Sequence, residues 1–230
     1  MKSSFFVALI AAVAQAKPHW SELQNYTFTQ FVAENELSLQ HGTEEFTLRK
    51  AIFEQELERV IAHNLHSGAT WKENVNHMSH LTASEKNAFL GRTKTKHDTL
   101  QSQKQANFEL KSLSELPTTV DWRTQGIVSA VKDQGRCGSC WAFASTATIE
   151  SHAALSTGLL FDLSPQQIAA CSPNPDQCGG QGNCNGATAE IAFDYVSKSD
   201  GLFEEFQYPY TEYNGNESAC AVPVGYASKV

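Results

Sequence analysis

Two cysteines three positions apart, Cys137 and Cys140, lie in a segment that reads DQGRCGSCWAFA from Asp133 to Ala144. A nearly continuous run of apolar and small residues follows Cys140 and ends near Gly158, which predicts a buried helix that begins at about Cys140. The unpaired amides at the start of a helix favour negative charge, and therefore the thiolate form of a cysteine. A thiolate is the nucleophile that acyl transfer requires. Cys140 is therefore the candidate nucleophile of this chain.

Three kinds of site use a cysteine pair with this spacing. A thioredoxin-like redox pair needs a preceding strand and a βαβ pattern, and here the tryptophan follows the second cysteine. A structural zinc site needs a second cysteine pair of matching spacing, which this sequence lacks. The third kind is a catalytic cysteine beside a structural one. The segment Cys137–Trp141, CGSCW, resembles the nucleophile signature of the papain-like cysteine proteases.

The resemblance to this family covers nearly the whole chain. Leu116–Arg123, LPTTVDWR, is similar to the start of a mature papain-family enzyme, and Tyr208–Tyr210, YPY, matches another stretch typical of the family. The resemblance implies that Gln134 is the oxyanion-hole glutamine, whose side-chain amide acts together with the backbone N–H of Cys140. It implies that the turn Gly182–Gly186 pairs with the substrate. The substrate-binding residues implied in this way are Gly138, Ser139, Trp141, Asn185, Gly186 and Ala187.

Besides the candidate nucleophile, the sequence contains five cysteines. The family resemblance implies two disulfides, Cys137–Cys184 and Cys171–Cys220. Cys178 is then the odd one, and we expect it to pair with a cysteine in a lobe outside this chain. The main alternative is a short local bridge between Cys171 and Cys178.

Residues 17–115 contain no cysteine and predict a small helical unit. One helix is expected around Thr27–Leu39. A second has apolar residues at helical spacing, namely Phe46, Phe53, Leu57, Val60, Ile61 and Leu65. From residue 92 to residue 115 the chain is polar and rich in Lys and Gln, which predicts an exposed linker that is easily cut.

This helical unit resembles the propeptide of the papain-like proteases. Six residues keep the register of the family's interspersed helix motif, namely Glu45, Arg49, Phe53, Glu56, Val60 and Asn64. Glu56 stands where the motif has Asn, and Val60 where it has Ile. A second and more degenerate match is Asn76, Met78, His80, Leu81 and Thr82. The resemblance implies that residues 17–115 are an inhibitory, folding-assisting propeptide that also acts as an intramolecular partner.

Seven of the eight histidines lie before residue 100. We expect release of the propeptide at acidic pH, and these histidines gain charge as pH falls through about 6.5. Because the mature half is acidic, that charge need not by itself drive release, and His80 is only a candidate switch. His80 replaces an aspartate of the family motif, a departure from the family's usual acid trigger. The alternative is that these histidines are simply exposed.

The chain has 230 residues and a net charge of -8. This charge argues against nucleic acid or an anionic membrane as the main partner. No run of 18 or more apolar residues follows the N-terminus, so no membrane anchor is expected. We expect no metal and no cofactor, peptide or protein substrates as partners, and a monomer when the protein is complete.

Residues 1–16, MKSSFFVALIAAVAQA, predict a cleaved export signal. Export places the cysteines in an oxidising compartment, where they can pair. Asn25 and Asn216 lie in Asn-x-Ser/Thr sequences, which predict glycosylation. We therefore expect the protein in the secretory pathway, and finally outside the cell or in a lysosome or vacuole.

In papain-like enzymes the catalytic His and Asn lie about 130–150 residues after the Cys, whereas 90 residues follow Cys140 here. His152, the one histidine after residue 100, lies on the same predicted helix, about 18 Å away. We therefore expect Val230 to mark a truncation and the chain to be inactive alone. The expected fold is α+β and papain-like with two lobes, of which this chain contains the mainly helical N-terminal lobe, residues 116–230, after the propeptide 17–115.

Two functions follow from these predictions. The first is a cysteine endopeptidase zymogen, secreted or lysosomal, that hydrolyses peptide bonds through a Cys140 thiolate and an acyl-enzyme. The alternative is a non-catalytic, propeptide-like inhibitor of cysteine proteases. A transcript that continues into a histidine and an Asn-Ser-Trp-like segment would favour the first, and an authentic stop codon the second.

Overall fold

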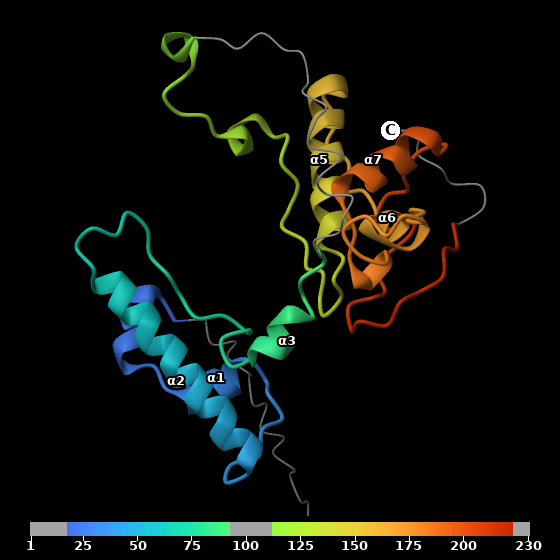
Figure 1. Ribbon diagram of the computed structural model, residues 1–230. Coiled ribbons are helices and arrows are strands. Elements are labelled where there is room, and N and C mark those ends of the chain that lie inside the picture. Colours follow the sequence, from blue (N-terminus) through green and yellow to red (C-terminus); the bar gives the residue numbers. More distant parts are fainter. Residues whose placement is uncertain (1–17, 93–111, 223–230) are drawn as a thin grey trace, which may run out of the picture. The chain divides into compact units, whose positions relative to one another are not determined.

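The computed structural model describes residues 18–92 and 112–222 (Figure 1). The chain divides into two compact units, one that ends at Lys86 and one that begins at Asn87. The predicted export signal lies outside the described residues, as does most of the predicted linker. No helix in the described ranges is long and apolar enough to cross a membrane.

The first unit is helical. It consists of the 3₁₀ helix η1 (Trp20–Asn25) and the helices α1 (Phe28–Glu34), α2 (Glu44–Leu65) and α3 (Ala83–Asn87), the last of which continues into the second unit. Its core residues are Leu23, Tyr26, Phe28, Phe31, Phe53, Leu57, Val60 and Val75. α1 is shorter than expected, because Glu36 beyond its end adopts a left-handed backbone with a φ of 51°. Leu65 is largely exposed, so the buried stripe of α2 ends before it.

The predicted helix motif joins α2 to the chain that follows it. Arg49 binds the carboxylate of Glu85 with both terminal nitrogens, and this guanidinium lowers the pKa of Glu85 to about 2. Glu45 adds a weaker contact to Arg49 at 3.4 Å. The side-chain amide of Asn64 accepts from the backbone N–H of Glu73 at 2.7 Å and donates to its carbonyl at 2.8 Å. Of the remaining motif residues, Phe53 and Val60 are buried and Glu56 binds Arg59.

The second unit packs α5 (Cys140–Thr157), α6 (Pro165–Cys171) and α7 (Ala189–Lys198) against one another (Figure 1). Short 3₁₀ helices lie at Leu113–Glu115 (η2), Trp122–Gln125 (η3) and Asn183–Asn185 (η4). The apolar core consists of Trp141, Ala142, Leu163, Ile168, Ala169, Ala187, Ala192 and Leu202. Over residues 112–222, β pairing is limited to a single bridge between Leu163 and Glu204. The expected mainly helical lobe is therefore confirmed.

Local signals set the ends of the helices in this unit. α5 stops at Gly158, which has a left-handed φ of 76° that favours glycine. α6 begins after Ser164, whose hydroxyl accepts the backbone N–H of Gln167 at 3.1 Å, with Pro165 in the first helical position.

Both predicted disulfides are present, Cys137–Cys184 and Cys171–Cys220. The alternative bridge between Cys171 and Cys178 is therefore wrong, and Cys178 is a free, buried thiol. The first disulfide joins the chain just before α5 to the turn at η4. The candidate nucleophile and the predicted substrate-pairing turn are thereby held together.

Candidate active site

The candidate nucleophile is the first residue of α5. This helix start is where the sequence predicted it, and Cys140 is a free, partly exposed cysteine. Ser139 precedes the helix, and its carbonyl accepts the backbone N–H groups of Ala142 at 2.8 Å and Phe143 at 3.2 Å. The thiol therefore lies at the positive end of the helix dipole.

The side-chain amide of Gln134 is held beside the start of α5. Its Nε2 donates to the carbonyl oxygen of Cys137 at 2.8 Å and to that of Phe89 at 2.9 Å. A donor in this place can stabilise the oxyanion of a tetrahedral intermediate. In this structure that donor is engaged by a main-chain carbonyl of residues 87–92, which belong to the second compact unit.

Gly91, in the same segment, passes directly over the Cys140 thiol. Its carbonyl accepts the backbone N–H of Ala187 at 2.9 Å. A Cβ placed on Gly91 would lie 1.9 Å from the carbonyl oxygen of Gly138 and 2.8 Å from Sγ of Cys140, so a larger residue does not fit. Sequence analysis identified neither Phe89 nor Gly91, because nothing in their local sequence marks them as site residues.

The last residue of the turn predicted to pair with a substrate, Gly186, lies against Gly91. Gly186 has a φ of +86°, and a Cβ on it would lie 2.2 Å from the carbonyl oxygen of Gly91, so glycine is required on both counts. The indole N–H of Trp141 donates to the carbonyl of Asn183 at 3.1 Å and ties the turn to α5. The main chain of Gly138, Gly186 and Ala187 thus lines the space beside the thiol that Gly91 occupies.

The predicted substrate-binding residues fall into two groups. Gly138, Gly186 and Ala187 are buried, and their backbone atoms lie against Gly91. Ser139 and Trp141 are buried and bind other protein groups, and the exposed Asn185 donates to Glu217 at 2.7 Å. Contact of these residues with a substrate stays a prediction.

Tyr210 joins the two sides of the site. Its hydroxyl donates to the backbone carbonyl of Gln134 at 2.9 Å and accepts from the hydroxyl of Ser139 at 2.8 Å. Its ring packs edge-on against Phe143 at 4.8 Å between centroids, and burial raises the pKa of Tyr210 to about 12. Sequence analysis noted this tyrosine as part of a family stretch but did not find its role, since its partners lie 71 and 76 residues earlier.

A buried ion pair supports the loop that carries Gln134. Lys132 donates to the fully buried Glu150 at 2.7 Å, to the carbonyl of Leu163 at 2.6 Å and to Asp162 at 2.7 Å. Glu150 also accepts the backbone N–H of Leu163 at 2.7 Å. Because both charges are paired and hydrogen-bonded, this group can lie in the interior and fix the loop against α5.

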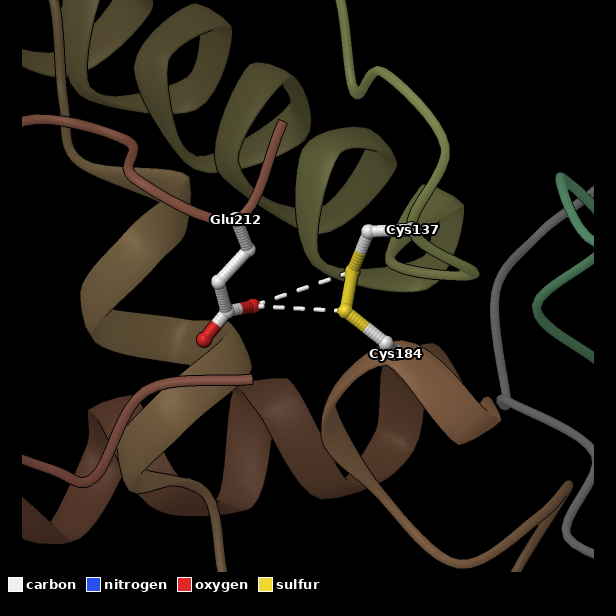
Figure 2. A group of neighbouring side chains, drawn as sticks. All are labelled: Cys137, Cys184 and Glu212. Atoms are coloured by element: carbon white, nitrogen blue, oxygen red, sulfur yellow. Dashed lines mark hydrogen bonds between the residues drawn. A yellow bond between two sulfur atoms is a disulfide. The ribbon is translucent and has the colours of Figure 1, made fainter. Parts of the chain in front are cut away.

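A buried carboxylate, Glu212, lies against the Cys137–Cys184 disulfide (Figure 2). Its Oε2 is 3.7 Å from each sulfur. The three possible ligand atoms lie within 4.8 Å of one another. Metal binding by cysteine needs a thiolate, and both sulfurs are joined in a disulfide, so this group is not a metal site in its present state.

Both predicted glycosylation sites lie on the surface. Asn25 and Asn216 are exposed. Ser218 of the second site, however, has its hydroxyl bound to Glu212 at 2.8 Å. Glycosylation stays a prediction at both positions.

The family model and the relatives that match this chain indicate the papain-like cysteine proteases. A family model described as papain family cysteine protease matches residues 116–228. The chain is 33% identical over 219 residues to digestive cysteine proteinase 2 of Homarus americanus, covering 94% of this chain and 63% of the relative. It is 36% identical over 183 residues to procathepsin L of Rattus norvegicus, covering 76% of this chain and 51% of that protein. The chain therefore spans between about half and two thirds of these two relatives.

Solved structures agree with the sequence comparison. Digestive procathepsin L 3 of Tenebrio molitor larval midgut matches with a TM-score of 0.64 and 26% identity, over 93% of this chain and 64% of that one. The recombinant stem bromelain precursor matches with a TM-score of 0.68 and 26% identity, over 86% of this chain and 61% of that one. Both are similar in fold to this chain.

Proposed function

This chain belongs to the papain family of cysteine proteases, and from that premise we propose that it is the N-terminal part of a cysteine endopeptidase zymogen. Residues 17–115 are the inhibitory propeptide, with a linker at 92–115, and the enzyme begins at residue 116. Cys140 is the nucleophile and Gln134 an oxyanion donor. Peptides and proteins are the substrates, as the protease names of the relatives suggest.

One observation carries the zymogen proposal. The carbonyl of Phe89 takes the side-chain donor of Gln134, and the carbonyl of Gly91 takes the backbone donor of Ala187. Gly91 also lies against Sγ of Cys140. A peptide substrate would need the same donors and the same space, so this segment and a substrate exclude each other.

The proposed chemistry is acyl transfer to the thiol. The Cys140 thiolate attacks the carbonyl carbon of the scissile bond, and the oxyanion accepts from Nε2 of Gln134 and from the backbone N–H of Cys140. Collapse of the tetrahedral intermediate releases the amine and leaves a thioester, which water hydrolyses. Proton transfer needs a general base. His152 is not that base, because it lies twelve residues along α5, about 18 Å from Cys140. By family resemblance the base belongs to the second lobe.

The secretory pathway is the proposed location, leading outside the cell or to a lysosome or vacuole. The pattern of residues 1–16 and the two disulfides support this location. One relative is a KDEL-tailed cysteine endopeptidase of Arabidopsis thaliana. No contact among residues 18–92 and 112–222 favours the alternative function, a non-catalytic inhibitor.

Hydrolysis of a fluorogenic dipeptide by the complete, processed protein tests the proposal. Cys140→Ala should abolish turnover, whereas Cys178→Ala, which replaces a cysteine without a part in the proposed chemistry, should retain it. Gln134→Ala should lower kcat by about 10²–10³ if its amide stabilises the oxyanion. Turnover by Cys140→Ala would overturn the assignment of the nucleophile, and a change of a few-fold in Gln134→Ala would overturn that of the oxyanion donor.

A further inference from the structure

Glu212 is a fully buried carboxylate whose two oxygens have very different surroundings. Oε1 accepts three hydrogen bonds, from Nε2 of Gln166 at 2.9 Å and from the backbone N–H and hydroxyl of Ser218, both at 2.8 Å. Oε2 faces the disulfide, 3.7 Å from the sulfurs of both Cys137 and Cys184 (Figure 2). The carboxylate is thus anchored through Oε1, and its other oxygen is in contact with both sulfurs of the disulfide.

This contact affects the chemistry that would open the disulfide. A reductant thiolate attacks Sγ of Cys184, the partly exposed residue of the pair, and forms a mixed disulfide with it, while Cys137 leaves with the electron pair as a thiolate. A second reductant thiolate then attacks the mixed disulfide, so that Cys184 leaves as a thiolate and the reductant departs as its own disulfide. A nearby like charge disfavours each thiolate, and a thiol that ionises less readily leaves more slowly. Because Oε2 is equally close to both sulfurs, the effect does not depend on which one leaves.

We infer that the carboxylate of Glu212 protects the Cys137–Cys184 disulfide from small-molecule thiols. The free thiol of Cys140 lies three residues from this disulfide. A cysteine protease needs a reduced nucleophile, and here the neighbouring bridge has to survive the same reductant. That need rests on the proposed function, whereas the protection itself does not. Glu212 thus allows Cys140 to stay reduced while Cys137 stays in its disulfide.

The test compares Glu212→Gln with Glu217→Gln in the full chain. Glutamine keeps an oxygen for the donors from Gln166 and Ser218 but presents an uncharged amide to the sulfurs. Glu217 is an exposed carboxylate in the same loop, so its replacement removes the same charge without touching the disulfide. Each protein is treated with 2-mercaptoethanol, alkylated at intervals and analysed by peptide mass spectrometry for Cys184. We expect Glu212→Gln to be reduced about tenfold faster than the wild type, a size typical of a like-charge contact, and Glu217→Gln to match the wild type. Equal rates in all three would overturn the inference.

The other disulfide, Cys171–Cys220, is the internal reference for folding. If Glu212→Gln speeds the reduction of both disulfides equally, the substitution has destabilised the second unit as a whole. The inference is then tested on the wild-type protein. Cysteamine, mercaptoethanol and mercaptoethanesulfonate are then compared as cationic, neutral and anionic reductants. The preference for the cationic thiol should be several-fold larger at Cys137–Cys184 than at Cys171–Cys220. Equal preferences would overturn the inference. Peptide hydrolysis is not a readout in either experiment, so failure here is distinct from failure of the proposed function.

Discussion

The carbonyl oxygen of Phe89 lies 2.9 Å from Nε2 of Gln134 and accepts its hydrogen bond. Two residues later the carbonyl of Gly91 accepts from the backbone N–H of Ala187, also at 2.9 Å. Residues 89–91 therefore block the candidate site with main-chain groups. Neither bond uses a side chain of residues 89–91. The type of residue in this segment therefore matters mainly at Gly91, where space for a side chain is lacking.

Replacement of Gly91 by Val should open the site. The added Cβ would lie 1.9 Å from the carbonyl oxygen of Gly138, a distance that forces the segment away from Cys140. We expect alkylation of Cys140 by iodoacetamide to become at least several-fold faster in the full chain, as followed by peptide mass spectrometry. Leu90→Val is the matched control, because Leu90 is in the same segment but 68% exposed. If both variants react at the wild-type rate, the segment does not shield the thiol.

Loss of the Tyr210 hydroxyl should loosen the oxyanion donor. Tyr210→Phe removes the bonds to Gln134 and Ser139, so we expect the free energy of unfolding to fall by about 1–2 kcal/mol. In the complete enzyme kcat should fall while KM is retained, because Gln134 acts on the transition state. Tyr195→Phe, which loses one bond to Gln167, should destabilise the unit without changing kcat. A kcat equal to the wild type in Tyr210→Phe would show that the hydroxyl is only structural.

His80 should make the first unit sensitive to acid. Burial lowers the pKa of His80, and the nearby charge of Arg49 adds to the effect. Among the described residues its Nδ1 has no hydrogen-bond partner, and its ring packs against Phe31. The unfolded chain therefore binds the proton more tightly, so stability is lost as pH falls below the ordinary value of 6.5. The Arg49–Glu85 pair does not share this response above pH 4.5, because its contribution to stability is lost only as pH falls from the ordinary Glu85 pKa of 4.5 toward the folded pKa of about 2.

Hydrogen exchange of α2 in the full chain measures this response. Protection of residues 44–65, corrected for intrinsic exchange, should fall between about pH 7 and pH 5 in the wild type and fall less in His80→Gln. His77→Gln is the control, because His77 is an exposed neighbour. An equal loss of protection in His80→Gln and the wild type would exclude His80 as the switch.

Glu205 should respond to pH in the opposite direction. Burial raises the pKa of Glu205, and the carboxylates of Asp162 and Glu150 contribute to the rise. The folded state therefore holds the proton more tightly than the unfolded chain, and this contribution to stability is lost as pH rises from the ordinary value of 4.5 through the folded pKa. Glu205→Gln should raise the urea midpoint at about pH 7 more than at about pH 4, with Glu204→Gln as the neighbouring control. A gain of equal size at both values would contradict the proposed cause.

The sequence by itself determined the features that depend on near neighbours. The helix that begins at Cys140 follows from an apolar run between a glycine-containing loop and Gly158, and its first residue was predicted correctly. The stripe of α2 from Phe53 to Val60 follows from its spacing. The two disulfides and the helical lobe followed from the family resemblance, because the cysteines and the motifs keep their register along the chain.

Only the tertiary structure decided which distant groups meet at the site. Tyr210 reaches Ser139 across 71 residues, and Phe89 reaches Gln134 across 45. Glu212 meets the disulfide from 75 residues beyond Cys137. Helix starts and apolar stripes are set by interactions a few residues apart, whereas these contacts form only when the packed core brings loops together. Neither the type of a residue nor its spacing from its neighbours in sequence indicates which distant loop will contact it.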